Sequence, residues 1–135
     1  MLLVRQWRTP ADRVLLEIPA GTLDRDEASG AIEDPELASR RELEEETGYR
    51  ARSWTRLAEF WTAPGFATEK MHLYLATDLE PADPDERLGP DADEHLGLDR
   101  RPFDEALGAV DGGEIQDAKS IAGLLLVDRR RRAGR

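Results

Sequence analysis

Cysteine is absent from this sequence, which excludes disulfide bonds and cysteine-ligated zinc. No apolar run approaches the roughly 20 residues of a membrane-spanning helix, and the opening Met-Leu-Leu-Val is no signal peptide. Positive charge is outnumbered, with 19 lysines and arginines against 29 aspartates and glutamates and a formal net charge of −10. This argues against binding to nucleic-acid backbones, which needs a basic face, but not against a phosphorylated small substrate, because a metal ion can invert the local field. We predict a soluble, cytoplasmic protein that binds neither nucleic acid nor membrane.

The length is that of one domain, residues 1–135, and no internal repeat is present. Residue patterns predict strands at 1–7, 14–18, 53–61, 70–77 and 94–99. Helices are predicted at about 35–47, from 101–107 to a break at 111–113, and from 115 to about 129. The acidic stretch 79–93 is predicted to be an exposed loop, and 129–135 a basic tail that complements a helix dipole. Periodicity alone indicates an α/β or α+β class.

The most highly charged stretch, residues 33–46, contains seven carboxylates and two arginines. Asp34 can cap a helix here, and Pro35 fits the first helical position. Gly48 can end the helix in a left-handed conformation. These end signals predict one acidic helix bounded by Asp34 and Gly48.

Three carboxylates of this helix face one way. At 100° per residue, Glu42, Glu45 and Glu46 share an arc of about 100°. One interpretation is a solvated, charged helix with Glu36–Arg40 as an ion pair. The other is a divalent cation site, for which such hard oxygen ligands favour Mg²⁺ or Mn²⁺. Spacing alone leaves both open.

Residues 41–49, Arg-Glu-Leu-Glu-Glu-Glu-Thr-Gly-Tyr, resemble the second half of the Nudix box, R-E-U-x-E-E-x-G-U, at every fixed position. Glu33 precedes Arg41 by eight residues, as the box requires. The first glycine of the box would fall at position 27, which is Glu27 here. The natural candidate is instead Gly21. It ends the stretch 17–21, Glu-Ile-Pro-Ala-Gly, which is similar to the family's E-x-P-A-G strand end. The interval from Gly21 to Glu33 is twelve residues instead of six, which predicts a six-residue insertion within 25–31.

Three further stretches resemble the ADP-ribose pyrophosphatase subfamily: residues 64–69 its S-P-G-x-x-x-E loop, 5–8 its Q-[YF]-R strand, and 113–120 the start of its final helix. The resemblance covers residues 2 to about 127 and implies an α/β/α sandwich with a mixed β-sheet. It also implies a homodimer. Subfamily members carry a further β-rich region before the Q-[YF]-R strand, so we expect either a minimal version or a shortened N-terminus.

The resemblance implies hydrolysis of the pyrophosphate bond of a nucleoside diphosphate derivative, with ADP-ribose cut to AMP and ribose 5-phosphate. Mg²⁺ or Mn²⁺ would polarise the phosphoryl oxygens, lower the pKa of a bound water and offset charge on the leaving phosphate. The implied metal ligands are the carboxylates of Glu42, Glu45 and Glu46 and the backbone carbonyl of Ala20.

Two acids are the catalytic candidates that the resemblance implies. Glu94 aligns with the residue that orients or deprotonates the attacking water, and Glu45 belongs to the box itself. Asp93 and His95 are the alternatives for the base. The alternative interpretation of Glu94 is an ordinary loop acid.

Substrate contacts are implied at Arg8, Glu17, Gly65 and Glu69. Arg8 would hold a phosphate, although an exposed edge-strand charge explains it equally well. Glu17 and Glu69 would accept hydrogen bonds from ribose hydroxyls. Arg41 is expected to pair with a box glutamate and fix its rotamer, and Glu33 to play a structural role beside it.

Other functions remain open. The domain could hydrolyse another nucleotide, such as a nucleoside diphosphate sugar, a dinucleotide or an oxidised nucleoside triphosphate. It could bind ADP-ribose without turnover, although the intact set of Glu42, Glu45 and Glu46 argues against this. A purely structural acidic domain is the third alternative.

Overall fold

The computed structural model describes residues 1–83 and 96–134. Its elements follow in this order: β1 (Leu2–Arg8), β2 (Arg13–Glu17), α1 (Pro35–Thr47), β3 (Tyr49–Trp61), β4 (Lys70–Pro81), β5 (Leu96–Arg100), α2 (Phe103–Asp111) and α3 (Ala118–Arg132). A short 3-10 turn, Thr9–Ala11, joins β1 to β2. The predicted α/β class and element order are confirmed. Among the described residues no helix is long and apolar enough to cross a membrane.

The described strands form two antiparallel sheets, where the resemblance implied one mixed sheet. One sheet has the order β2-β1-β5, and the other is the long β3–β4 hairpin. In the three-stranded sheet β1 is the central strand, paired antiparallel with β2 on one edge and with β5 on the other.

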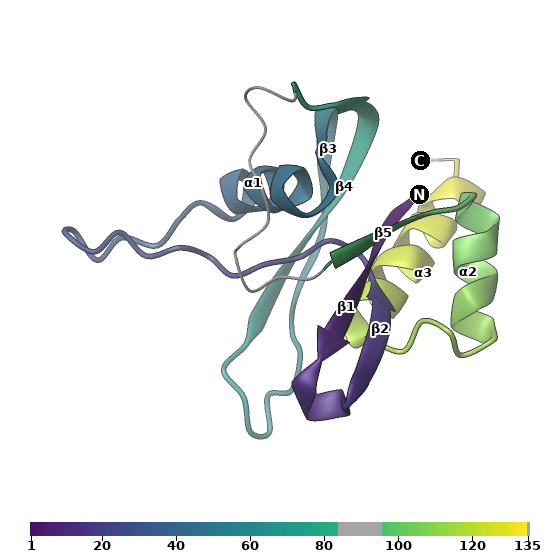
Figure 1. Cartoon of the computed structure of the whole chain (residues 1–135), viewed down its shortest axis with the longest axis horizontal. Helices are drawn as coiled ribbons and strands as arrows, with labels where there is room; N and C mark the ends of the chain where they lie inside the picture. Colours follow the sequence, from purple (N-terminus) through teal and green to yellow (C-terminus); the bar gives the residue numbers. More distant parts are fainter. Residues whose placement is uncertain (84–95, 135) are drawn as a thin grey trace.

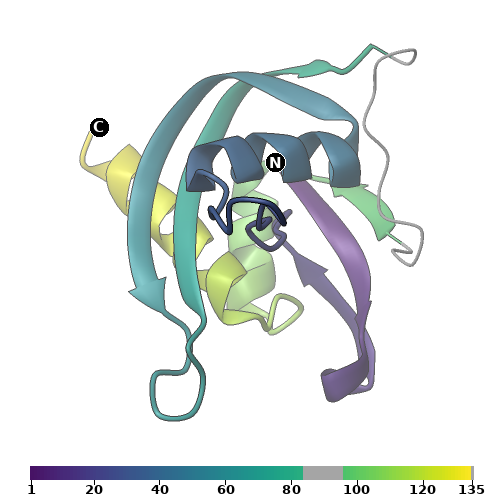
Figure 2. The same ribbon diagram turned by 90° about the vertical axis from the view of Figure 1, so that its left-hand side faces the viewer.

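Helices cover both sides of the hairpin. Figure 1 shows α1 beside β3 and β4, with α2 and α3 grouped on the far side near β1 and β2. Figure 2, turned by 90°, shows the β3–β4 hairpin curving around α1. The buried core joins the three-stranded sheet to α2 and α3 through Leu3, Leu16, Ala106, Ala109, Ile115 and Leu124. The arrangement leaves α1 and the end of β2 facing each other.

Several element ends differ from the prediction. Strand β4 continues to Pro81, so residues 79–81 belong to a strand that pairs with the beginning of β3. Gly48 turns the chain directly from α1 into β3, which therefore starts four residues before the predicted Ser53. The helix α3 starts at Ala118 because Asp117 caps it, and Ile115 is instead a buried core residue ahead of the helix. Residues 84–93 of the predicted loop lie outside the described residues.

Candidate metal and catalytic site

The acidic helix α1 has the boundaries that its local sequence predicts. The Asp34 carboxylate accepts hydrogen bonds from the backbone amides of Glu36, at 2.9 Å, and Leu37, at 3.1 Å. Gly48 has a φ of 70°, and its amide donates to the Glu44 carbonyl at 2.8 Å. Both ends are thus set by neighbouring residues, which fixes the direction in which each box carboxylate points.

Arg41 lies at the centre of the carboxylate cluster. Its Nη1 donates to Glu42 at 2.7 Å and to Glu45 at 2.8 Å. Its Nε and Nη2 donate to the two oxygens of Glu33, at 3.3 and 3.0 Å. The bonds to Glu33, joined by the charges of Glu42 and Glu45, raise the pKa of Arg41 above its ordinary value although burial opposes this. The same guanidinium lowers the pKa of Glu33. One cation therefore orients three carboxylates.

Glu46 and the predicted backbone ligand Ala20 lie side by side. The Ala20 amide donates to Glu46 Oε2 at 3.0 Å, and Glu46 is only 6% exposed. The next residue, Gly21, lies against Glu42 so closely that a Cβ there would be 1.9 Å from Glu42 Oε1. Only glycine admits the Glu42 carboxylate in this position. The tertiary structure thus brings the strand end 20–21 to the carboxylates of Glu42 and Glu46.

Glu44 points away from this cluster, as the helical geometry predicts. Its carboxylate accepts hydrogen bonds from Arg50 Nε and Nη2, at 2.7 and 2.8 Å. The side chain is buried, at 7% exposed. Glu44 therefore ties α1 to the beginning of β3.

The oxygen donors suit a divalent cation in their chemistry. Carboxylate and carbonyl oxygens are the ligands that Mg²⁺ and Mn²⁺ take. Within residues 1–83 and 96–134, however, no three acidic or histidine side chains converge on one point. Glu42 and Glu45 instead share the guanidinium of Arg41. A metal ion would therefore compete with Arg41 for these two carboxylates.

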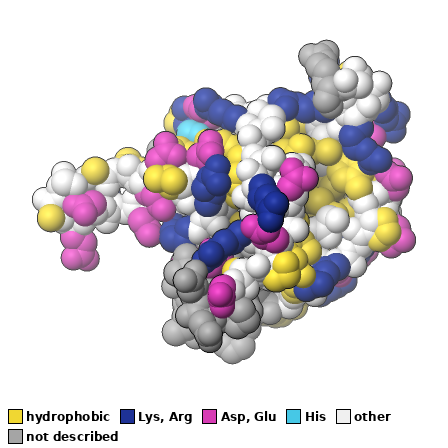
Figure 3. Space-filling model, turned by 90° about the horizontal axis from the view of Figure 1, so that it is seen from above, with side chains coloured by type: hydrophobic (Ala, Val, Ile, Leu, Met, Phe, Trp, Pro, Cys, Tyr) yellow, Lys and Arg dark blue, Asp and Glu magenta, His cyan; other side chains and the backbone are white. Residues whose placement is uncertain are grey.

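The extra residues before α1 form a loop that closes on itself. The Glu33 amide donates to the Asp24 carbonyl at 2.8 Å, and the Asp24 amide donates back to Glu33 Oε2 at 3.1 Å. Beyond this base, Arg25 and Ile32 form an isolated β-bridge, and residues 26–31 make the turn. The loop projects from the body of the protein, at the left of Figures 1 and 3. The insertion therefore delivers Glu33 to Arg41 without altering the helix.

Arg8 and Glu17, two predicted substrate residues, hold each other. Arg8 Nε and Nη2 donate to the two Glu17 oxygens, both at 2.8 Å. Lys119 Nζ also contacts Glu17, and it donates to Asp117 at 2.9 Å. Burial raises the pKa of Glu17, but the bonds from Arg8 and Lys119 outweigh it and leave that pKa below its ordinary value. Substrate binding by either residue stays a prediction. For Glu17, it would require the contact with Arg8 or with Lys119 to break.

Sequence reasoning did not single out Lys119. The stretch 113–120 served only as a subfamily marker, and Lys119 lies 102 residues after Glu17. No signal in the sequence points to this pair, because the need of the Glu17 carboxylate for a cationic partner follows from its burial in the folded chain.

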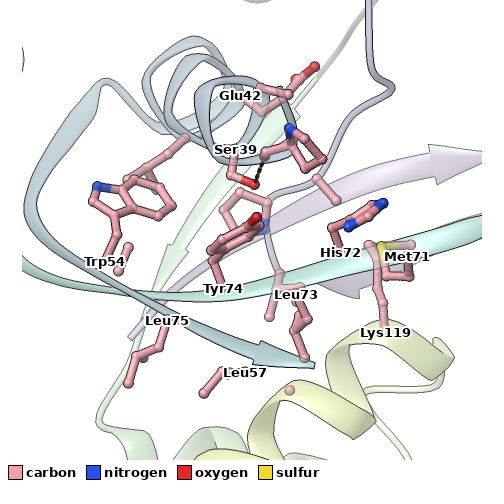
Figure 4. A pocket seen from close by; sticks show the side chains of 18 of the residues that line it. Ser39, Glu42, Trp54, Leu57, Met71, His72, Leu73, Tyr74, Leu75 and Lys119 are labelled. Carbon is pink, nitrogen blue, oxygen red and sulfur yellow. Dashed lines mark hydrogen bonds between the residues drawn. The ribbon is translucent and has the colours of Figure 1, made fainter. Parts of the chain in front are cut away.

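A cavity of about 610 Å³ lies between α1, β4 and α3. Trp54 and Tyr74 line it with rings 6.4 Å apart in an edge-to-face arrangement. Figure 4 shows Ser39 of α1 above Tyr74 and His72 of β4, with the Glu42 side chain pointing away from them and Lys119 of α3 below. Glu42 and Gly21 both belong to its wall. The cavity therefore adjoins the carboxylate cluster.

The predicted loop residues behave differently from each other. Glu69 lines the cavity, whereas Gly65 is outside its wall and has nothing within 4 Å of the place a Cβ would take. Phe66 beside it is 91% exposed. The predicted base Glu94 and its alternatives Asp93 and His95 lie outside the described residues, so their roles stay predictions.

Comparison with known proteins identifies the relatives of this chain. Residues 1–124 match the family model described as NUDIX domain. The chain is 39% identical to an ADP-ribose pyrophosphatase of Bacillus subtilis over 120 residues, which are 89% of this chain and 60% of the relative. It is 41% identical to an ADP-ribose pyrophosphatase of Mycobacterium tuberculosis over 125 residues, covering 93% and 57%. It is 37% identical to a GDP-mannose pyrophosphatase of Cronobacter sakazakii over 127 residues, covering 90% and 62%.

A solved structure has the same fold. The crystal structure of an ADP compounds hydrolase superposes with a TM-score of 0.77 at 25% identity, covering 98% of this chain and 66% of the other. The chain spans about 60% of the length of the curated relatives named above.

Proposed function

The chain belongs to the Nudix domain family, and on that premise we propose that it hydrolyses the pyrophosphate bond of ADP-ribose to AMP and ribose 5-phosphate. The carrying observation is the cluster on α1, where Arg41 orients Glu42 and Glu45 while Ala20 holds Glu46. Relatives named ADP-ribose pyrophosphatase, at 39% and 41% identity, support the choice of substrate.

In this proposal the metal ligands are Glu42, Glu45, Glu46 and the Ala20 carbonyl, and the ion is Mg²⁺ or Mn²⁺. A bound divalent ion supplies Lewis-acid polarisation of the pyrophosphate and a more acidic water. The protein's own part is to hold the ligands. Arg41 fixes the rotamers of Glu42 and Glu45, and the Ala20 amide fixes Glu46.

The proton of the attacking water passes, in this proposal, to the carboxylate of Glu94. The water oxygen then forms a bond to phosphorus as the bridging oxygen leaves with the other phosphate. Glu45, the second catalytic candidate, accepts a hydrogen bond from Arg41 on Oε2, and a bound ion would share its carboxylate with that guanidinium.

The cavity beside Glu42 is proposed to take part of the substrate. Its volume of about 610 Å³ falls in the range of small-molecule sites, roughly 300–1,000 Å³. Glu69 on its wall is proposed to accept from a ribose hydroxyl. Arg8, Glu17 and Gly65 complete the proposed substrate contacts. A homodimer and a cytoplasmic location are also part of the proposal, and light scattering of the purified protein tests the first.

GDP-mannose is the second candidate substrate. The observation in its favour is the 37% identity to a relative named GDP-mannose pyrophosphatase, close to the values for the ADP-ribose relatives. Both substrates have a pyrophosphate between a nucleoside and a sugar, so the same carboxylate cluster would serve either.

A substrate screen decides between these functions. The protein is incubated with ADP-ribose, GDP-mannose, a dinucleotide and an oxidised nucleoside triphosphate, each with Mg²⁺ and with Mn²⁺, and the products are separated by chromatography. Release of AMP from ADP-ribose supports the proposal. Pyrophosphate released from triphosphates alone contradicts it, and binding of ADP-ribose without turnover identifies a sensing domain.

Two neighbouring variants provide the internal control. Glu46→Gln should lower hydrolysis at least about 100-fold, since even the partners of metal ligands are worth about 10–100-fold. Glu44→Gln removes the anchor of Arg50 on the opposite face, so it should lower thermal stability while the hydrolysis rate stays near that of the wild type.

A further inference from the structure

We propose that Ser120, with Lys119 beside it, is a positioning residue that holds the Ala20 side of the metal site in place from the start of α3. The proposal rests on the function above only in taking Glu46 and Ala20 as metal ligands. Ser120 is completely buried, and its Oγ accepts a hydrogen bond from the Ile18 amide at 2.7 Å. The hydroxyl of this buried serine, at the start of α3, thus accepts from a backbone amide just beyond β2.

The tethered segment leads directly to the site. Strand β2 ends at Glu17, and beyond it the chain is attached on two sides. The Ile18 amide is bound to Ser120 of α3, and the Ala20 amide, two residues later, is bound to Glu46 of α1 at 3.0 Å. The segment 18–21 therefore bridges the two helices, and its position depends on both anchors.

Lys119 fixes the same junction through charge. Its ammonium group contacts the buried carboxylate of Glu17, the residue just before Ile18. It also donates to Asp117, whose carboxylate accepts from the Ser120 amide at 3.1 Å and so caps α3. Arg8 approaches Glu17 from β1. The start of α3 is therefore locked onto the end of β2 by a hydrogen bond and by paired charges.

The helix α3 also packs against the tethered segment. A Cβ at Gly123, one turn along α3 from Ser120, would be 3.5 Å from Ile18 Cδ1, an ordinary van der Waals distance. If Ser120 loses its hydroxyl, the Ile18 amide loses its acceptor in a part-buried position, and the segment must move to find another. Ala20 moves with it, which displaces both its carbonyl and the amide that holds Glu46.

The test is Mn²⁺ binding by the full chain without substrate, measured by electron paramagnetic resonance below the unfolding temperature of every variant. Ser120→Ala should weaken Mn²⁺ affinity about 10-fold or more, the usual effect of removing a partner of a metal ligand. Ser120→Thr keeps the hydroxyl and should restore most of it. Ile115→Val trims the buried core before α3 without touching these hydrogen bonds, so it should lower stability and leave Mn²⁺ affinity unchanged.

A second readout needs no metal. Hydrogen exchange of the Ile18 and Ala20 amides should become faster in Ser120→Ala than in Ile115→Val. If Ser120→Ala does not fold, Lys119→Met takes its place, with the same expected loss of Mn²⁺ affinity. Unchanged Mn²⁺ affinity in the hydroxyl-free variant, or an equal loss in Ile115→Val, overturns the proposal.

Failure of the proposed function can be distinguished from failure of the Ser120 proposal. A wild-type protein that binds Mn²⁺ but leaves ADP-ribose and GDP-mannose intact would refute the hydrolysis while the Ser120 effect on Mn²⁺ affinity still stands. A wild-type protein that binds no Mn²⁺ refutes the positioning role.

Discussion

Glu33 accepts two hydrogen bonds from the Arg41 guanidinium, at 3.3 and 3.0 Å, although the loop before it is six residues longer than the Nudix box expects. The pair forms because the extra residues close on themselves at Asp24 and Glu33. The chain therefore enters and leaves the insertion at nearly the same place. An insertion of this kind lengthens the loop and leaves Glu33 in contact with Arg41 of the helix.

Deletion of residues 26–31 should preserve the fold. It restores the six-residue spacing from Gly21 to Glu33, and it leaves Asp24, Arg25, Ile32 and Glu33 as four consecutive residues. The hydrogen bond from the Glu33 amide to the Asp24 carbonyl then becomes that of an ordinary β-turn. Since loop length costs little entropy, we expect a change below about 1 kcal/mol in urea unfolding.

Hydrolysis of ADP-ribose by the deletion variant should stay close to that of the wild type, because Arg41 keeps all three carboxylates. A variant that folds normally but loses activity would show instead that the projecting loop contacts the substrate.

Replacement of Arg41 should loosen the loop and destabilise the domain. Arg41→Met removes the partner of Glu33, Glu42 and Glu45 together with a contact to the Thr22 carbonyl. Leaving the three carboxylates without their cation should cost about 1–3 kcal/mol. Trypsin should also cut after Arg25 faster than in the wild type, as followed by mass spectrometry.

Arg40→Met is the matched control for this prediction. Arg40 forms an exposed ion pair with Glu36, so its replacement should lower the free energy of unfolding by less than about 1 kcal/mol. Equal cleavage of the two variants after Arg25 would mean that Arg41 does not hold the loop.

Gly21→Ala should disturb the proposed metal site without unfolding the protein. The new methyl group would lie 1.9 Å from Glu42 Oε1, and the flexible carboxylate would have to move away. We expect Mn²⁺ affinity and hydrolysis to fall about 10-fold or more, measured by titration and by AMP release.

Gly108→Ala is the control, because nothing lies within 4 Å of its Cβ position in α2 and alanine favours a helix. It should be slightly more stable than the wild type and bind Mn²⁺ as tightly. If Gly21→Ala behaves in the same way, the close approach of Gly21 to Glu42 has no role in the site.

Acid should weaken the domain through Asp99. Hydrogen bonds from Arg101, and then from Arg5, lower the pKa of Asp99 from its ordinary 3.8 to about 2, although burial opposes them. Because the folded-state pKa is the lower one, this stabilisation is complete above about pH 4 and is lost as the pH falls toward about 2. Asp99→Asn should therefore cost about 1–2 kcal/mol at pH 7 and flatten the melting temperature between pH 4 and 2.

The exposed pair of Asp104 with Arg131 provides the comparison for Asp99. Asp104 is 82% exposed, so Asp104→Asn should change the melting temperature little at pH 7. An Asp99→Asn protein that still loses stability as steeply as the wild type below pH 4 would assign the acid sensitivity to other carboxylates.

The acidic helix could be predicted from its own residues. Its capping aspartate, first-turn proline and terminal glycine act within one turn of the backbone, so they determine its ends wherever the segment lies. The rotation per residue then determines that Glu42, Glu45 and Glu46 share a face and that Glu44 does not. The family followed from this stretch and its spacing to Glu33, and the α/β class from the periodicity of the whole chain; both are confirmed.

The partners of these elements were decided by the tertiary structure alone. The first strand, β1, pairs with β2 and with the distant β5, and the ion pair of Lys119 with Glu17 joins residues 102 positions apart. The same holds for Ser120 and Ile18, and for Gly21 and Glu42. Contacts of this kind depend on how distant segments pack, and the residues next to either partner in the chain do not predict them. The sequence by itself therefore determined which side chains the helix presents, and the folded chain determined what holds them in place.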